Sequence, residues 1–459
     1  MTKPKKFAAK PLEKPNFQGG FPVNESPNVI KERLLSLIRE LAASPELFVK
    51  NPGTDFTRKR KLPFETMLQL LIAMGGNSLT KELLEAQGYS LDTATTSAFI
   101  QQRDKILPCV FAYLLHEFTS SHTNVKTYRG YRLLASDGSD LHTPTNPNDL
   151  DSFLQNRPEE KGYNLFHLNA LYDLCNRLYV DALLQPRGQV NEHRALTDMV
   201  QRSRIKGKVI VTADRGYESY NNFAHIERKG WRYLIRVKDL GSNGILSGLK
   251  LPKDGEFDLS VHRILTRKQT KKVKAQPALY RFLPSNVTFD FLDLHTNKFY
   301  PMSFRVVRFK ITEDSYETVI TNLSTAYFSS EDLKKLYNMR WGIETSFREL
   351  KYAVGLTNFH AKKREHIAQE VFARLIMYNF SEMITSHVVI SKADTKYTYQ
   401  VNFSAAIQIC RHFLRCPGLA PPPNVEALIR KNILPVRPGR QNKRNIRFRS
   451  AVSFLYRVA

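Results

Sequence analysis

Between residues 125 and 239 apolar segments alternate with amphipathic ones, and this alternation restricts the chain to few folds. Residues 131–135 and 208–213 each predict a strand, and Asp137 and Asp214 come at or just after the strand ends. Residues 165–184 predict two strands joined near Asn176, and residues 233–237 predict another. Helical patterns fit residues 192–202 and 222–229. Strands followed by helices in this order predict an α/β sheet with at least some parallel pairing.

The rest of the chain divides around this α/β segment. Residues 1–25 are rich in Lys and Pro and predict a basic flexible arm, whereas residues 26–120 carry a series of helical patterns. Residues 240–315 break the rhythm with short strands punctuated by Gly and Pro, which predicts a β-rich insertion. The main sheet resumes at about residue 316, and helices follow up to residue 395. Residues 396–459 predict a C-terminal helical region that ends in a basic tail.

The net charge indicates the kind of partner. The chain has 69 Lys and Arg against 43 Asp and Glu, a formal charge of +26. Such an excess indicates a polyanion, either nucleic acid or an anionic membrane surface. The longest uncharged stretch, residues 66–80, is too short and too often interrupted by polar residues to cross a bilayer. The basic N-terminus lacks the apolar stretch of a signal peptide, so we expect a cytoplasmic protein that does not enter a membrane.

Two short helical patterns, residues 80–86 and 93–106, suggest a helix-turn-helix arrangement. The second carries Gln101, Gln102 and Arg103, whose side chains can reach base edges and phosphates in a major groove. A solvated face of a helical bundle would explain the same residues. Contact with DNA is therefore one of two interpretations of this helix.

Asp137 and Asp214 are the first candidates for chemistry. Both are expected where a strand reaches the C-terminal edge of the sheet, which is where such sheets usually open to ligands. Carboxylates on adjacent strands can share a divalent cation, because Mg²⁺ prefers oxygen ligands. Either aspartate alone could equally cap a turn or a helix. Asp140 could compete for the metal, but a turn beyond the first strand is the favoured role. Glu192 opens the helix at residues 192–202 and could lie near the crevice, but a capping role is favoured.

A third carboxylate is expected on a long helix. Residues 329–332 form a capping signature, and the helix they begin extends to about residue 352. At roughly 100° per residue, one face about 80° wide carries an aromatic ring, three cations and one carboxylate. These residues are Tyr337, Arg340, Glu344, Arg348 and Lys351. They fit a metal-binding carboxylate flanked by phosphate-binding cations, and they also fit a solvated face with salt bridges. Trp341, beside this face, could stack on a base or pack internally.

The segment from Tyr337 to Lys351 resembles the Tyr-x2-Arg-x3-Glu-x6-Lys signature of bacterial insertion-sequence DDE transposases, in the family usually numbered four. The residues around Asp137 and Asp214 are similar to those around the two catalytic aspartates of that family. The resemblance implies an α/β fold with an RNase H-like catalytic core, in two parts at residues 125–239 and 316–395. It also implies that residues 240–315 interrupt this core, that residues 26–120 bind DNA and that the C-terminal region is helical.

The resemblance also implies a role for each signature residue. Asp137, Asp214 and Glu344 would be the catalytic residues and the ligands of two Mg²⁺ ions, for which Mn²⁺ could substitute. In the family, the Tyr, Arg and Lys of the signature hold a DNA phosphate. This implies DNA contacts for Tyr337, Arg340 and Lys351, with help from Arg348 and Trp341.

The activity implied is cut-and-paste transposition. It comprises metal-dependent hydrolysis at the element ends, hairpin formation and strand transfer into target DNA. The partners would be double-stranded terminal inverted repeats and target DNA, bound by a homodimer at the bacterial nucleoid. Two alternatives stay open: a domesticated relative that binds DNA without catalysis, and an RNase H-like nuclease without strand transfer.

Overall fold

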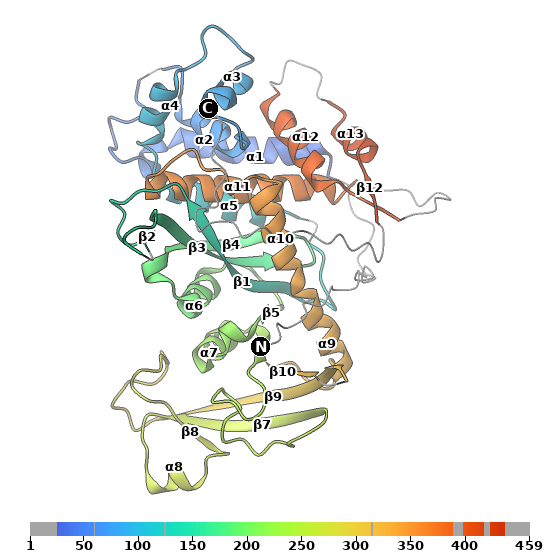
Figure 1. Cartoon of the computed structure of the whole chain (residues 1–459). Coiled ribbons are helices and arrows are strands. Elements are labelled where there is room, and N and C mark those ends of the chain that lie inside the picture. The colour runs from blue at the N-terminus through green and yellow to red at the C-terminus, as the bar shows by residue number, and fades with distance from the viewer. Residues whose placement is uncertain are drawn as a thin grey trace.

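The computed structural model describes residues 25–436 except residues 59, 124, 156, 314, 389–397 and 417–422. Most of the predicted arm and the basic end of the tail therefore lie outside the described residues. The described chain has a mixed α/β fold, in which a central ten-stranded sheet is covered by helices (Figure 1).

The first half of the sheet is formed by residues 132–237. Its strands are β1 (Arg132–Thr143), β2 (Phe153–Leu154), β3 (Tyr163–Asp173), β4 (Leu178–Pro186), β5 (Val209–Ala213) and β6 (Arg232–Val237). β1 pairs antiparallel with β3 and parallel with β5, and β5 pairs parallel with β6. β3 also pairs with β2 and β4, and the turn between β3 and β4 contains Asn176. The predicted alternation and the parallel pairing are confirmed.

The second half of the sheet is an extension of the first. β10 (Ser315–Thr321) pairs antiparallel with β6, and β9 (Phe299–Thr312), β7 (Phe257–Thr266) and β8 (Tyr280–Phe282) follow in that order. A short helix, α8 (Lys271–Ala275), lies between β7 and β8 in the chain. The strands of residues 240–315 thus continue the central sheet at the edge formed by β6 and β10.

Two faces of the sheet are covered by different helices. α6 (Glu192–Arg202) and α7 (Tyr220–Arg228) pack on one face, in a hydrophobic cluster that includes Leu134 of β1. Ala135 and Leu141 of β1 belong to the cluster on the opposite face, which contains the N-terminal and C-terminal helices. Since successive side chains of a strand point to opposite faces, Asp137 lies on the same side as Ala135.

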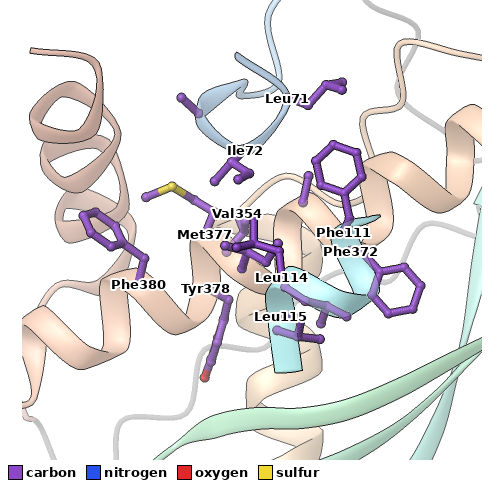
Figure 2. Close-up of a cluster of buried hydrophobic side chains, with 14 of the residues drawn as sticks. Leu71, Ile72, Phe111, Leu114, Leu115, Val354, Phe372, Met377, Tyr378 and Phe380 are labelled. Carbon is purple, nitrogen blue, oxygen red and sulfur yellow. The ribbon is translucent and has the colours of Figure 1, made fainter. Parts of the chain in front are cut away.

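The larger helical layer is built around α11 (Arg364–Thr385), which is buried along most of its length. Figure 2 shows part of its core, in which Phe372, Met377 and Tyr378 of α11 meet Phe111 and Leu114 from the N-terminal region. The other long helices of this layer are α1 (Pro27–Ala43), α2 (Phe64–Ala73), α5 (Cys109–Ser120) and α12 (Phe403–Arg415), and the shorter ones are α3 (Leu79–Ala86), α4 (Thr96–Arg103) and α13 (Val425–Lys431). Within the described ranges, no helix is long and apolar enough to cross a membrane.

The predicted long helix near residues 330–352 is in fact two helices. α9 (Ser330–Met339) begins at the expected capping box, in which Ser329 and Asp332 bond each other's backbone N–H groups. α10 (Trp341–Tyr352) follows directly, with Arg340 at the junction. α10 packs on β1 and on α11, so its residues are carried to the face of the sheet that holds Asp137. A separate two-stranded sheet, β11 (Tyr399–Gln400) with β12 (Leu434–Pro435), completes the described structure together with three short 3₁₀ helices at Pro45–Phe48, Arg187–Gln189 and Arg215–Tyr217.

Candidate active site

Asp137 lies in the middle of β1. The expectation that the strand ends before it is wrong, because β3 is long enough to pair with residues on both sides of Asp137, up to Thr143. For the same reason Asp140 lies within β1 and does not serve a turn. The carboxylate of Asp137 accepts a hydrogen bond from the backbone N–H of Gly138 at 2.9 Å, which fixes its orientation.

Asp214 directly follows β5, as expected. β5 is the parallel neighbour of β1, and Ser136 is paired with Ala213 at the end of the register, so the two aspartates lie on adjacent strands. The Asp214 side chain also caps the short 3₁₀ turn after it, where Oδ1 accepts a hydrogen bond from the backbone N–H of Gly216 at 2.7 Å. The strand-end and capping interpretations therefore both hold for this residue.

Glu344 lies in the first turn of α10 and is connected to Asp137 through Arg340. One guanidinium nitrogen, Nη2, is 3.0 Å from Glu344 Oε1, and the other, Nη1, is 4.0 Å from Asp137 Oδ2. The side chain of Arg340 is only 4% exposed, while that of Glu344 is 42% exposed. A buried cation thus lies between two of the three carboxylates, and Glu344 remains accessible.

The electrostatics of Asp137 depend on both other carboxylates. Burial raises the pKa of Asp137 to about 6, and the negative charges of Asp214 and Glu344 add to this effect. The Gly138 N–H and the Arg340 guanidinium oppose it. A group held by this balance is a natural ligand for a cation, because a positive ion would remove the repulsion among the carboxylates.

The donor chemistry of this centre fits a hard divalent cation such as Mg²⁺. Its present spacing is not that of a closed metal cage: in the part of the chain that the structure describes, no three His, Cys, Asp or Glu side chains are grouped closely enough to bind a metal ion. Arg340 occupies the bridging position between Asp137 and Glu344. The three carboxylates thus match the ion in the kind of ligand atom that they offer, and not in their present spacing.

The other residues of the signature lie in different environments. Lys351 Nζ donates a hydrogen bond to the backbone carbonyl of Asp140 at 2.8 Å, and burial lowers the pKa of this lysine. Arg348 is exposed on α10. Trp341 is 46% exposed, and the Arg340 guanidinium lies 4.8 Å from the centroid of its ring. Tyr337 is buried behind Arg340 in a cluster with β9, β10 and α9. The structure thus brings Arg340 and Lys351 to β1, with Arg348 and Trp341 facing solvent.

The three candidate residues of α4 differ in exposure. Gln101 is exposed and Gln102 is partly exposed. Arg103 is 2% exposed and forms a salt bridge of 2.9 Å with the equally buried Glu370 of α11. Its Nε also donates a hydrogen bond of 2.8 Å to Gln369. The predicted DNA contact therefore does not hold for Arg103, because α11 supplies acceptors that fix its guanidinium inside the protein.

A group of side chains that sequence reasoning missed lies beside the aspartates. His167 of β3 contacts Asp140 Oδ1 through Nδ1 at 2.7 Å and Glu192 Oε1 through Nε2 at 2.9 Å. Glu192 is the first residue of α6 and not its cap, since Asn191 fills that position and accepts a hydrogen bond from Arg194 N. His167 gave no local signal, because its role depends on pairing with a strand distant in sequence.

Comparison with known proteins identifies the family. The family model described as "Transposase DDE domain" matches residues 128–380. Among solved structures, the chain is similar to one described as "Cryo-EM structure of piggyBac transposase synaptic complex with hairpin DNA (SNHP)", with a TM-score of 0.41 and 10% identity over 91% of this chain and 87% of that chain. The search of curated proteins gave no match. Since the family model covers more than half of the sequence, including all three carboxylates, the chain belongs to the transposase DDE domain family.

Proposed function

We propose that this protein is a cut-and-paste DNA transposase that hydrolyses phosphodiester bonds at the ends of a mobile element. The observation that carries the proposal is the convergence of Asp137, Asp214 and Glu344, two of which share the buried guanidinium of Arg340. Membership of the chain in the transposase DDE domain family supports transposition as the overall activity.

The reaction requires carboxylates that are oriented before the substrate arrives. The backbone N–H groups of Gly138 and Gly216 hold Asp137 and Asp214, and Arg340 holds Glu344. These three carboxylates would bind two Mg²⁺ ions, or Mn²⁺ in their place. When bound, such ions activate an attacking hydroxyl and stabilise the leaving oxygen of a phosphodiester. The protein itself then needs no nucleophilic side chain.

The DNA strand is held by the cations of α10. Arg348 and Lys351 lie on the same helix as Glu344, and Arg340 stands one turn before it, so a phosphate next to the scissile bond meets several positive charges. Tyr337 packs behind Arg340 and supports it, and the exposed ring of Trp341 is available to stack on a base. Such a grip suits a hairpin intermediate, in which a sharply bent strand must be held until water opens the hairpin and frees the 3′-hydroxyl that then joins target DNA. The Tyr337–Lys351 signature further supports membership of the bacterial insertion-sequence family four.

The N-terminal helices are proposed to bind the terminal inverted repeats. Gln102 of α4 lines a cavity of about 320 Å³ whose other lining residues include Arg58, Arg60 and Lys105. Among the described residues that line this cavity none is acidic, although Asp55 lies 4.0 Å from Lys105, and this positive lining suits the phosphate backbone of a duplex. Gln101 lies on the same helix and is exposed, with a hydrogen bond of 3.3 Å from its amide to the Ser97 hydroxyl, and is proposed to reach a base edge. We further propose that a homodimer pairs two such ends in the bacterial cytoplasm, at the nucleoid, and joins them to target DNA.

The experiment that tests the proposal uses labelled duplex DNA from the borders of the coding region, with Mg²⁺. We expect nicked, hairpin and joined products from the unchanged protein, and none from Glu344→Ala, whose DNA affinity should stay within about 2-fold because an exposed carboxylate contributes little to binding phosphate. Glu331→Ala is a matched control, since Glu331 is an exposed glutamate of α9 that pairs with Lys335.

The products discriminate among the candidate activities. Cleavage without hairpin or joined products would identify a nuclease without strand transfer. Binding without any cleavage would identify a non-catalytic DNA-binding protein. Cleavage by Glu344→Ala would contradict the assignment of the active site.

A further inference from the structure

A run of positive charge lies in the second half of the sheet, where residues 262–274 contain six Lys and Arg and no Asp or Glu. The two arginines of this run serve the fold. Arg263 is 1% exposed and donates to backbone carbonyls around it, and Arg267 donates to carbonyls within residues 283–292. The four lysines are exposed, and within the described part of the chain none of them forms an ion pair; they are Lys268, Lys271, Lys272 and Lys274.

The short helix α8 carries three of these lysines and is anchored from beneath. The Thr270 side chain caps the helix by accepting a hydrogen bond from Val273 N, and Val273 itself is buried. Lys271 and Lys274 are three residues apart, so they lie on one side of the helix. Their side chains therefore extend into solvent from a backbone whose position is fixed.

An aromatic part of the sheet surface lies beside the lysines. At the start of β9, residues 299, 301 and 303 are exposed and residues 302 and 304 are buried, so one face of the strand is open to solvent here. Phe299 on this face is 55% exposed, and its ring centroid lies 6.0 Å from that of Tyr280 in β8. Lys272 Nζ lies 5.9 Å from the centroid of the Tyr280 ring. Positive charge and exposed aromatic surface are thus adjacent, a combination typical of proteins that bind nucleic acid.

The charge of this surface decides the kind of partner. A second copy of a chain with a net charge of +26 would be repelled by the unpaired lysines, whereas a polyanion would be attracted. Lysine binds a phosphate as a point charge and reads no base, so the surface suits DNA of any sequence. An exposed phenylalanine can in addition enter the minor groove and unstack a base step, which bends the duplex.

The position of the surface separates it from the region proposed to bind the element ends. Figure 1 shows α8 and β8 at one end of the molecule and α2, α3 and α4 at the other, with β1 and β5 between them. In the sheet, β6, β10 and β9 lie between β5 and β7, so four strand spacings give a separation of roughly 20 Å. This length corresponds to about six base pairs of duplex DNA. A duplex that runs from the catalytic carboxylates to this surface therefore extends away from the N-terminal helices.

We propose that this surface binds target DNA during strand transfer. It consists of Lys268, Lys271, Lys272, Lys274, Tyr280 and Phe299. The inference rests on the proposed function, because target DNA is a substrate only for an enzyme that joins strands. The lysines hold the phosphates of a target of any sequence, and Phe299 opens a base step so that the duplex bends. Element end and target then reach the carboxylates from opposite sides.

The test measures cutting and joining separately on the full chain. One assay follows nicking and hairpin formation on a labelled element end, and the other supplies a labelled precut end with a plasmid as target. We expect Lys271→Gln combined with Lys274→Gln to lower joining at limiting target by about 5-fold or more, with cutting changed by less than about 2-fold. Raising the target concentration should restore joining, because the catalytic carboxylates are untouched.

The matched control removes the same amount of charge elsewhere. It combines Arg39→Gln with Lys335→Gln, which are exposed cations of α1 and α9 with acidic partners. This control should join target DNA normally. Phe299→Ala should lower joining without affecting cutting, and Phe299→Tyr should restore it because the ring is kept.

The outcomes distinguish this inference from the proposed function. Normal joining by the double lysine variant would overturn the inference and leave the proposed function intact. An equal loss of cutting and joining would also overturn it, since the surface would then bind the element end or its flank. So would an equal loss of joining in the control. If the unchanged protein neither cuts nor joins DNA, the proposed function fails and the inference fails with it.

Discussion

At the scale of single residues, the carboxyl group of Asp137 links stability to pH. Its folded-state pKa, about 6, lies above the ordinary value of 3.8, so the fold favours the protonated form. The resulting stabilisation is complete below about pH 4 and is lost as the pH rises through 6. Any ligand that needs the ionised form must therefore overcome this preference at low pH.

This balance predicts the behaviour of Asp137→Asn. Between pH 4 and pH 6 the free energy of unfolding of the unchanged protein should fall relative to that of Asp137→Asn, by up to about 3 kcal/mol at roughly 1.4 kcal/mol per pKa unit. Urea unfolding in EDTA measures the difference, because divalent ions are then excluded. A difference that does not change with pH would show that Asp137 is not buried among like charges.

The residues that sequence could identify are those whose signal is local. Asp214 follows its strand and Glu344 lies on a helical face, and both patterns can be read from neighbouring positions. His167 and Glu192 could not be found in this way. Their contact depends on the register between β1 and β3 and on the direction in which α6 leaves the sheet, neither of which the sequence states.

At the scale of elements, a partly buried polar cluster packs against α10, with the side chain of Arg177 50% exposed and that of Glu382 4% exposed. Arg177, in the turn after β3, lies 3.1 Å from Glu349 of α10 and 2.7 Å from Glu382 of α11. The hydroxyl of Tyr378 also donates to Glu349 at 3.0 Å. Glu349 is partly buried whereas its neighbour Arg348 is exposed, so this cluster fixes the helix that presents Glu344.

Removing Arg177, the cation between Glu349 and Glu382, should weaken the attachment of α10 to α11. We expect Arg177→Met to lower the free energy of unfolding by about 1–2 kcal/mol, because the carboxylate of Glu382, which is 4% exposed, would lose its cationic partner and keep only the hydroxyls of Tyr378 and Thr385. Arg348→Ala removes an exposed side chain of α10 and should lower the free energy of unfolding by less than about 0.5 kcal/mol. Urea unfolding measures both. A second change, Glu382→Gln, should restore part of the loss in Arg177→Met, and failure to do so would argue against an electrostatic clamp.

Elements were predicted well where periodicity was strong and poorly at their ends. The helix at residues 192–202 has the predicted bounds, and Ser329 caps the N-terminus of α9 as the sequence signature predicts. The division at Arg340 was not foreseen, because apolar positions continue through the junction and Arg340 itself keeps helical backbone angles, φ −51° and ψ −34°.

At the scale of the whole molecule, the positive charge is expected to govern DNA affinity. The cavity lined by Arg58, Arg60 and Lys105 lies in the helical region proposed to bind the element ends. If Arg60 contacts a phosphate, Arg60→Gln should make the dependence of DNA binding on salt less steep. The slope of the logarithm of the association constant against the logarithm of the salt concentration should become smaller in magnitude by about 0.9. Fluorescence anisotropy of duplex DNA between low and moderate salt measures the slope. Arg39→Gln, an exposed arginine of α1 paired with Glu32, is the control, and equal slopes for all three proteins would exclude the contact.

The arrangement of the large parts was only partly predictable. The α/β class followed from the order of strands and helices, whereas the continuation of the sheet into β9, β7 and β8 did not. Short strands broken by Gly and Pro look alike whether they extend a sheet or form their own. Long-range pairing decides between the two, and it depends on residues far apart in the chain.

The buried position of α11 has a consequence for synthesis of the chain on the ribosome. Arg374 of α11 donates to the backbone carbonyls of Met74 and Gly75, groups about 300 residues earlier, and Arg103 meets Glu370 across a similar interval. The first helices to leave the ribosome pack on one another, but their core stays incomplete until α11 has emerged. A nascent chain that stops before α11 should expose these apolar faces and be cleared by proteases, so a transposase able to cut DNA would exist only after translation has passed this helix.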